Sequence, residues 1–388
     1  MVRSSREVEA WEGGLSTFAV ARIEKAMQAL YATGTQPAIA LCILRRGHVV
    51  FDRAIGHAHL GGAEATPDTP FCIFSISKAV TAMVIHLLDA RNLLRIDDPV
   101  AEYIPEFARH GKEWMTVRHV LTHRAGIPSV AGHADVSLLA RPDEIVRLLC
   151  DAKPVSVPGR RLAYHAITGG YVLGEIVRRV TKKSINDVLM DEIAKPLGMP
   201  WFRYGVSEDK ASAVATNYFT GPKVPPVLSA IVKRALGVPF ERAVELSNDP
   251  SFLGAVIPSG NVVSTAFELA RFFEMLRRGG ELDGVRIFDD RTVKRALVES
   301  SYLELDLTLG LPVRYGLGLM LAGDRLSPFG PHTSRAFGHY GFINCVGWAD
   351  PERAISCALL TSGKPFVGPH LVKFWSLLEA IAKNIPAD

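Results

Sequence analysis

The 388-residue sequence lacks any long uninterrupted hydrophobic run. A membrane-spanning helix needs about 20 predominantly apolar residues, so we expect no membrane span. The first segment, Met1–Gly14, carries arginines and glutamates and no apolar core, which is unlike a secretory signal. These two absences lead us to expect a cytoplasmic protein.

An excess of charge of one sign is also missing. The chain has 44 basic and 40 acidic residues, a net charge of +4, and no dense basic run. Binding to nucleic acid or to anionic lipid needs clustered basic residues, so we expect neither partner. With 48% hydrophobic residues the composition is that of an ordinary globular protein. We expect a small-molecule partner, and the sequence is compatible with a homo-oligomer.

Cysteines are few, and no two of them form a Cys-x-x-Cys pair. The five are Cys42, Cys72, Cys150, Cys345 and Cys357. Because the number is odd and several lie in apolar runs, we expect unpaired thiols that pack as small hydrophobic side chains. Unpaired thiols suit a reducing compartment.

Two common hydrolase signatures are absent from the chain. No Gly-x-Ser-x-Gly elbow occurs, which argues against an α/β-hydrolase. The twelve histidines include no His-Glu-x-x-His, which argues against a zinc hydrolase. We expect neither a metal nor an organic cofactor.

The elements at the two ends of the chain mirror each other. An amphipathic helix over 16–34 precedes strands over Ala38–Leu44 and Val49–Ala54. Near the other end, strands over Ile343–Ala349 and Ala354–Thr361 precede a closing helix. The spacing predicts one antiparallel sheet with flanking helices, built from both ends of the chain.

The middle of the chain is rich in helical patterns and proline breaks. We therefore predict a discontinuous α/β sheet domain, residues 1–96 and 249–388, and a mainly helical domain, residues 97–248. Within the latter, Gly221–Pro239 places an apolar segment between prolines. Two interpretations stay open for it: a surface excursion that packs on itself, or a lid over an apolar substrate site.

A candidate nucleophile lies where an apolar run, beginning at Pro70, leads into a long helix. Ser75 and Lys78 are three residues apart, so they share one helix face. A hydroxyl becomes a good nucleophile when a neighbouring amine takes its proton, and burial favours the uncharged amine. The spacing alone is weak support, because Ser207 and Lys210 share it in a polar stretch.

Several further motifs accompany this pair in a fixed order. They are Asp97–Val100 with Tyr103–Glu106, Thr116–Gly126, Pro158–Tyr164, Leu173–Ile176, Pro196–Met199, Gly338–Gly341 and Asp350–Glu352. Together with Phe74–Lys78, this series resembles the serine β-lactamase and penicillin-binding-protein superfamily, over about residues 37 to 361. The resemblance implies an α/β (α+β) fold of the β-lactamase/transpeptidase type. An antiparallel sheet flanked by helices would carry an inserted helical domain, with the active site between them.

The resemblance also implies roles for individual residues. Tyr164 falls at the catalytic tyrosine, and either Lys78 or Tyr164 could hold the proton in the resting enzyme. The backbone N–H groups of Ser75 and Phe342 would form the oxyanion hole.

The final motif strand carries the other expected substrate contacts. Gly341 would let a substrate lie close to the strand. His339 and Tyr340 would face the substrate. Two roles stay open for His339: a hydrogen bond to the substrate or to Tyr164, or a purely structural role. Trp348 would either line the pocket or pack in the core.

Two positions depart from the pattern of the drug-hydrolysing members. Ala166 replaces the usual asparagine of the tyrosine motif, and His339 replaces the usual lysine of the final motif. Both changes resemble the esterase branch, the family VIII carboxylesterases related to class C β-lactamases. We therefore expect a serine hydrolase that cleaves esters of small to medium acyl chains through a Ser75 acyl-enzyme. The alternatives are a β-lactamase or D-amino-acid peptidase, an acyltransferase, or a non-catalytic binding protein.

Overall fold

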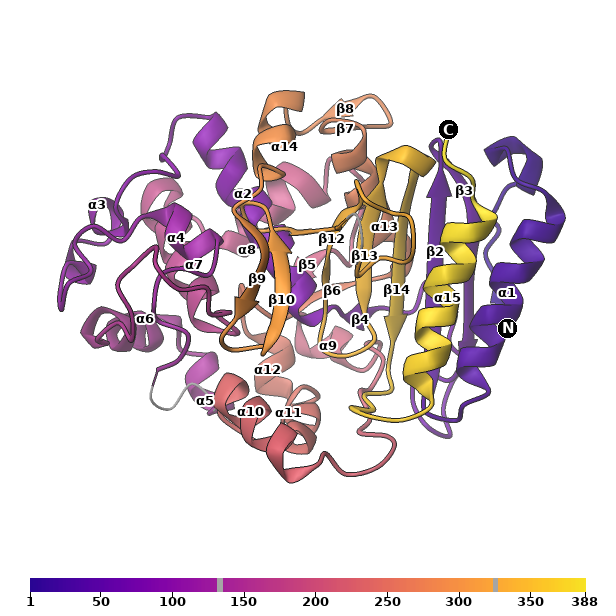
Figure 1. Ribbon diagram of the computed structural model, residues 1–388, viewed down its shortest axis with the longest axis horizontal. Helices are drawn as coiled ribbons and strands as arrows, with labels where there is room; N and C mark the ends of the chain where they lie inside the picture. Colours follow the sequence, from indigo (N-terminus) through magenta and orange to yellow (C-terminus); the bar gives the residue numbers. More distant parts are fainter. Residues whose placement is uncertain (131–134, 324–326) are drawn as a thin grey trace.

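A nine-stranded antiparallel sheet organises the computed structural model, which describes residues 1–130, 135–323 and 327–388. Its strand order is β1-β3-β2-β14-β13-β12-β11-β10-β9 (Figure 1). The strands are β1 (Val2–Arg3), β2 (Ala38–Arg45), β3 (His48–Gly56), β9 (Ser301–Asp306), β10 (Leu311–Tyr315), β11 (Met320–Leu321), β12 (Phe337–Tyr340), β13 (Val346–Asp350) and β14 (Ile355–Thr361). Because β2 pairs with β14, the two ends of the chain share one sheet, as predicted.

Helices cover both faces of this sheet. They are α1 (Thr17–Tyr31) and α15 (His370–Asn384) on one face and α13 (Ala266–Arg277) on the other. The odd-numbered residues Ile39 to Ile43 of β2 pack with the α1 and α15 cluster, and the even-numbered residues Ala38 to Leu44 pack with the α13 cluster. A strand buried on both faces explains why β2 is almost continuously apolar.

The predicted ends of two elements need correction. Helix α1 is capped by Ser16, whose Oγ accepts the N–H of Ala19 at 3.1 Å, but it ends at Tyr31 and not at Gly34. Strand β13 begins at Val346 and not at Ile343, because Ile343 and Asn344 have φ angles of +44° and +64°. Such left-handed residues interrupt the extended backbone that a strand requires.

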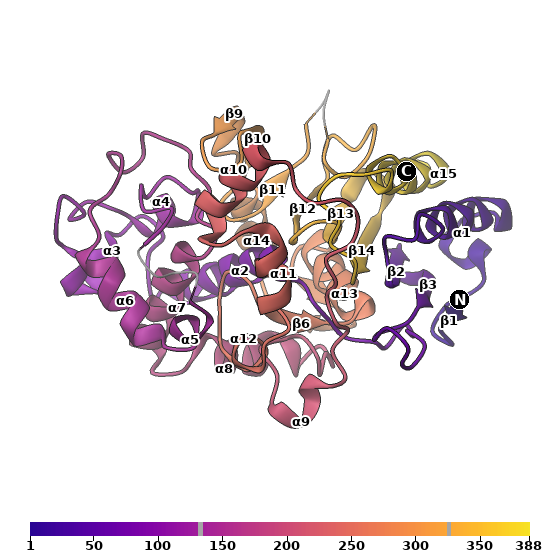
Figure 2. The ribbon, with the colours of Figure 1, turned by 90° about the horizontal axis from the view of Figure 1, so that it is seen from below.

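The middle of the chain is mainly helical, as predicted. Its helices are α3 (Val100–Tyr103), α4 (Val117–Leu121), α5 (Val136–Leu139), α6 (Pro142–Asp151), α7 (Thr168–Thr181), α8 (Ile185–Leu189), α9 (Glu208–Ala211), α10 (Pro226–Leu236), α11 (Phe240–Leu246) and α12 (Pro250–Gly254). Figure 1 shows α10 and α11 at the lower edge of the molecule, and the view from below in Figure 2 shows them in the middle. No helix in the described part of the chain has the length and apolar character needed to cross a bilayer.

Helix α2 (Ser77–Ala90) links the helical region to the sheet region. It packs against α7 and α8 on one side and against α14 (Asp290–Ala296) and β12 on the other. Nearly all its side chains are buried, which is typical of a helix surrounded by other elements. The elements on both sides of α2 therefore hold its N-terminal end in place.

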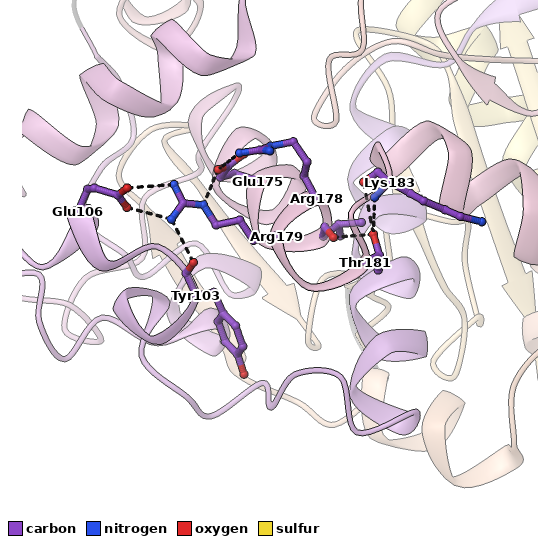
Figure 3. A network of polar contacts seen from close by, with 8 residues as sticks. Tyr103, Glu106, Glu175, Arg178, Arg179, Thr181 and Lys183 are labelled. Atoms are coloured by element: carbon purple, nitrogen blue, oxygen red, sulfur yellow. Dashed lines mark hydrogen bonds and ion pairs between the residues drawn. The ribbon is translucent and has the colours of Figure 1, made fainter.

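An ion network joins α7 to the segment around α3 (Figure 3). Buried Glu175 on α7 accepts hydrogen bonds from Arg178 Nε at 2.7 Å and from Arg179 Nε at 2.6 Å. Arg179 also donates to Glu106 at 3.0 Å and to the carbonyl oxygen of Tyr103. Arg179 thus connects two helical elements that are distant in sequence.

Two small sheets complete the fold. Strands β4 (Phe71–Cys72), β6 (Val262–Ser264) and β5 (Arg203–Tyr204) form one, and β7 (Glu281–Leu282) and β8 (Val285–Arg286) form a hairpin. All five cysteines are buried and unpaired, which confirms that prediction.

Candidate active site

Ser75 lies in a short turn between β4 and α2. The N–H of Ile73 donates to Val262 of the neighbouring strand at 2.9 Å, which fixes the backbone just before the turn. Phe74 then adopts a φ of +51°, a left-handed conformation that costs a bulky residue about 1–2 kcal/mol. Ser75 therefore sits in a 3-10 turn just before α2 begins at Ser77, slightly earlier than the predicted first helical turn. The turn leaves Ser75 half-buried at the wall of a cavity.

The predicted partner Lys78 reaches Ser75 directly. Its Nζ lies 3.0 Å from Ser75 Oγ, 2.8 Å from the carbonyl oxygen of Ala166 and 2.9 Å from that of Ser259. The side chain is buried, and this burial lowers the pKa of Lys78 well below its ordinary value. Within the described residues no carboxylate forms an ion pair with Lys78, so nothing opposes that shift.

The three neighbours of Lys78 define how a neutral amine would be oriented. Carbonyl oxygens only accept hydrogen bonds, so Ala166 and Ser259 take the two N–H groups of the amine. The lone pair then points toward the remaining neighbour, the hydroxyl of Ser75. This arrangement suits removal of the Ser75 proton.

Tyr164 lies on the loop before α7 and completes the group. Lys78 Nζ is 4.8 Å from the centroid of its ring. Burial raises the pKa of the Tyr164 phenol above its ordinary value, and a contact with the Ser75 hydroxyl opposes this only partly. The phenol is therefore protonated at neutral pH.

A buried aspartate, which the sequence analysis did not single out, holds the backbone of Tyr164. Asp306 Oδ1 accepts the N–H of Tyr164 at 3.0 Å and also the N–H groups of Thr308 and Leu309, at 2.8 and 3.0 Å. It thereby joins the tyrosine loop to the tip of the β9–β10 hairpin. The available signal was an acidic residue between Leu305 and Leu307, in a stretch where leucines alternate with polar residues.

Three buried histidines surround Tyr164, of which the sequence analysis named only His339 as a site residue. The ring of His123 lies 4.7 Å from that of Tyr164, and the N–H of His165 donates to Nδ1 of His123 at 3.3 Å. Burial lowers the pKa of His165 and of His339 to about 3, and lowers that of His123 well below its ordinary value. All three rings are neutral at pH 7, so they add no positive charge beside Lys78.

The final motif strand lies directly against the nucleophile segment. A Cβ atom on Gly341 would approach the carbonyl oxygen of Ile73 to 2.6 Å, so only glycine fits there. The glycine thus serves close approach of the protein's own backbone, where we had expected a bound substrate. Within the described residues, neither the N–H of Ser75 nor that of Phe342 donates a hydrogen bond, so both remain available to a ligand.

A cavity of about 430 Å³ opens onto Ser75. Leu228, Val232 and Leu236 of α10 line it, together with Phe240 of α11 and Phe342. Among the described residues that line the cavity, His339 is the only one with an ionisable acidic or basic side chain apart from the tyrosines, and its ring is neutral at pH 7. The structure therefore favours the lid interpretation of Gly221–Pro239 over a segment that only packs on itself.

Two residues named as candidate substrate contacts, Trp348 on β13 and Tyr340 on β12, lie on the α15 face of the sheet. Trp348 is fully buried on the opposite face of the sheet, stacked on Phe329, so it does not line the cavity. Tyr340 contributes to the cavity wall, but its hydroxyl donates to the carbonyl oxygen of Pro328 and its ring packs toward Phe374. Residues alternate across a strand, which explains why Trp348 and Tyr340 face α15.

His339 points toward the cavity but makes a local contact. Its Nδ1 lies 2.6 Å from the carbonyl oxygen of Tyr340, and its ring centroid is 6.4 Å from that of Tyr164. Within the described residues His339 forms no hydrogen bond with Tyr164.

Known proteins share both this fold and much of this sequence. The chain is 31% identical over 336 residues to the esterase/beta-lactamase LipL of Mycobacterium tuberculosis (strain ATCC 25618 / H37Rv), covering 83% of this chain and 76% of that protein. A penicillin-binding protein homologue from Caulobacter crescentus superposes with a TM-score of 0.82 at 28% identity, covering 96% of this chain and 99% of the other. A family VIII carboxylesterase superposes with a TM-score of 0.81 at 25% identity, covering 94% and 98%.

The names of these relatives support hydrolase activity of the serine esterase and β-lactamase type. The strand order and helix placement are those of the β-lactamase/transpeptidase-like fold, which confirms the expected fold class. The sequence model of the beta-lactamase family matches residues 22–382, nearly the whole chain, and the chain therefore belongs to the beta-lactamase family.

Proposed function

We propose that the chain is a serine carboxylesterase acting on esters of small to medium acyl chains. The observation that carries this proposal is the placement of the Lys78 lone pair on the Ser75 hydroxyl, at the wall of a cavity without charged side chains. Such a cavity suits an uncharged, apolar ester better than a carboxylate-bearing drug.

In the acylation step, Ser75 Oγ attacks the ester carbonyl carbon while its proton passes to Lys78 Nζ. The carbonyl oxygen gains negative charge, which the N–H groups of Ser75 and Phe342 stabilise. Lys78 is suited to the role of base because burial lowers its pKa and so favours the uncharged amine, whereas burial raises the pKa of Tyr164 and keeps the phenol protonated. The choice between Lys78 and Tyr164 thus falls to Lys78.

In the second half of acylation, the ester C–O bond breaks and the alkoxide leaves as an alcohol. Tyr164 gives its proton to the departing oxygen and recovers one from the Lys78 ammonium. Water then repeats the sequence on the acyl-enzyme: its proton passes to Lys78, its oxygen bonds to the acyl carbon, and Ser75 is released protonated. The sum is ester plus water giving acid plus alcohol, with no other reactant.

Three observations favour esters over β-lactams and peptides. Ala166 offers no side-chain amide to bind a substrate amide, and only its carbonyl oxygen contacts Lys78. His339 is neutral at pH 7 and cannot pair with the carboxylate of a penicillin. The 430 Å³ cavity lies beside Ser75 and is lined largely by Leu, Val and Phe side chains.

The Ser75→Ala variant tests the nucleophile. We expect hydrolysis of p-nitrophenyl butyrate to be lost while the thermal unfolding midpoint is retained. Ser207→Ala is the matched control, because Ser207 shares the spacing to a lysine but caps the short helix α9 on the surface. The measurement is kcat/KM together with intact mass after a phosphonate soak, which should add one phosphonyl group to wild type and none to Ser75→Ala. Retained activity in Ser75→Ala would contradict the proposal.

Relative turnover separates the ester and lactam activities. On one preparation, kcat/KM for p-nitrophenyl butyrate should exceed that for a chromogenic cephalosporin, and added short alcohols should change the product ratio little. A faster cephalosporin reaction would indicate a β-lactamase, and dominant transfer to the alcohol would indicate an acyltransferase.

A further inference from the structure

A second buried lysine, Lys364, lies next to the proposed oxyanion hole and has no role in the mechanism above. It follows strand β14, and its side chain has no exposed surface. In the described part of the chain no carboxylate lies within ion-pair distance of it. Burying a lysine without an acidic partner lowers the stability of the fold, unless other contacts of its amine compensate.

Lys364 Nζ has three neighbours, one for each N–H direction of an ammonium. It lies 2.6 Å from the carbonyl oxygen of Thr361, 3.3 Å from Cys345 Sγ and 4.9 Å from the ring centroid of Phe74. An aromatic face attracts a cation, so the Phe74 contact is favourable. The side chain therefore connects the end of its own strand, β14, to two other segments.

The first of these segments is the loop that carries Phe342. Gly341 donates its N–H to the carbonyl oxygen of Cys345 at 2.8 Å, which closes the loop. Inside it, Ile343 and Asn344 adopt positive φ angles, and two such non-glycine residues in succession persist only where the surroundings hold them. Lys364 contacts Cys345, the residue that closes this loop.

The second segment is the turn that carries Ser75. Phe74 precedes the nucleophile with a φ of +51°, so it is also held in an unfavourable conformation. Its ring contacts both Lys364 and the ring of Phe342, whose centroid is 5.3 Å away. Lys364 thus contacts the strained residue beside one oxyanion donor and the loop that presents the other.

We propose that Lys364 is a positioning residue that sets the two N–H groups of the oxyanion hole, those of Ser75 and Phe342. This inference rests on the proposed acyl-enzyme function. Lys364 acts through Phe74 and Cys345, because its Nζ is taken up by protein atoms. Removing it would let the two strained segments relax and move the donors away from the developing oxyanion.

The test compares an oxygen ester with the corresponding thionoester, in which sulfur replaces the carbonyl oxygen. Sulfur accepts hydrogen bonds weakly, so a thionoester gains little from the oxyanion hole. The ratio of the two kcat/KM values reports on the hole and is independent of the fraction of active enzyme. A merely structural role for Lys364 would lower both values equally and leave this ratio unchanged.

In Lys364→Met we expect the oxoester/thionoester ratio to fall about tenfold, less than the roughly 10²- to 10³-fold cost of deleting an oxyanion donor. The fall should appear in kcat, with KM for the oxoester nearly unchanged.

Lys112→Met is the matched control. Lys112 is also fully buried, contacts the carbonyl oxygens of Cys150 and Ala152, and lies 5.1 Å from the ring centroid of Phe107. It has the same chemistry far from Ser75, so its ratio should equal that of wild type. An unchanged ratio in Lys364→Met, or an equal fall in Lys112→Met, would overturn the proposal.

Cys345→Ala covers the case in which Lys364→Met does not fold. It removes the sulfur contact of Lys364, together with the two longer contacts of the sulfur with Thr361, and we expect a fall of the ratio by about threefold, a fraction of the full effect. An unchanged ratio in this variant would then overturn the role of Lys364. Failure of the esterase proposal itself looks different: wild type would hydrolyse neither ester and Ser75 would not be phosphonylated, and both proposals would then fall together.

Discussion

At the scale of single residues, the buried lysines Lys78 and Lys364 differ in the groups that surround their amines, and we propose different roles for them. Lys78 donates to two carbonyl oxygens and meets the hydroxyl of Ser75. Lys364 meets one carbonyl oxygen, the sulfur of Cys345 and the ring of Phe74. The hydroxyl of Ser75 opens onto the cavity, whereas the thiol of Cys345 is buried and does not line it, so only Lys78 is placed to take a proton from a group that can attack a substrate.

The Lys78→Arg variant tests whether residue 78 must accept a proton or only needs to carry a positive charge. Arginine stays protonated in proteins, so it cannot accept the Ser75 proton, and we expect kcat/KM to fall by about 10³-fold between pH 6 and 9. In wild type the active form is the uncharged amine, and burial lowers the pKa of Lys78. Activity should therefore persist at neutral pH and decline as the pH falls through this lowered pKa. A pH profile of kcat/KM checks both statements, and substantial activity in Lys78→Arg would contradict them.

At the scale of elements, α10 decides the depth of the cavity. Leu228, Val232 and Leu236 recur every four residues, so they form one helix face, and all three line the cavity. Pro226 begins the helix, and Gly237, with a φ of +81°, ends it. The helix is thus a defined wall whose inner face can be changed without altering Ser75, Lys78 or Tyr164.

The Val232→Phe variant should shorten the space for the substrate chain. We expect kcat/KM for p-nitrophenyl octanoate to fall about tenfold relative to the acetate, because a chain that no longer fits loses roughly 0.8 kcal/mol for each methylene left in water. Lys233→Phe adds the same ring to the exposed side of α10 and should leave the chain-length profile unchanged. Equal profiles for both variants would show that α10 does not bound the acyl site.

The ion network on α7 affects stability and not the chemistry. Burial raises the pKa of Glu175, but the hydrogen bonds and charges of Arg178 and Arg179 outweigh this and leave the pKa below its ordinary value. A carboxylate with a lowered pKa stabilises the fold above its unfolded-state pKa and ceases to do so as the pH falls through the folded-state value.

Glu175→Gln should therefore lower the free energy of unfolding by about 2 kcal/mol at pH 7, less than for a fully buried pair because both arginines reach solvent. Urea unfolding at pH 7 and pH 3 should show that the difference shrinks at the lower pH. Glu106→Gln removes the exposed partner of Arg179 and should change stability by less than about 1 kcal/mol. A pH-independent loss in Glu175→Gln would indicate a packing effect.

At the scale of the whole molecule, the ordered motifs were enough to predict the fold class, and they placed Ser75 beside Lys78. The strands at the two ends followed from β-rich apolar runs and from the turn residues that join them. Asp306 and Lys364 escaped the sequence analysis because their partners lie far along the chain: Asp306 holds Tyr164, and Lys364 reaches Phe74. Trp348 lies on the α15 face of β13, away from the cavity, and which of the two faces of this strand meets the cavity depends on the packing of the whole sheet. The division into residues 1–96 with 249–388 and residues 97–248 stays a prediction.

The pairing of β2 with β14 has a consequence for synthesis on the ribosome. Arg45 is the last residue of β2 and pairs with Ile355, the first residue of β14. The hairpin of β2 and β3 is made early, and its partner strand β14 is made only after nearly the whole remaining chain. At about 5–20 residues per second this delay is roughly 15–60 seconds, during which an apolar strand edge stays unpaired. Ser75 and Lys78 emerge early, but the loop of Phe342 emerges among the last segments. A nascent chain therefore contains Ser75 long before the oxyanion hole can form. Chaperones that cover strand edges should raise the yield of active enzyme.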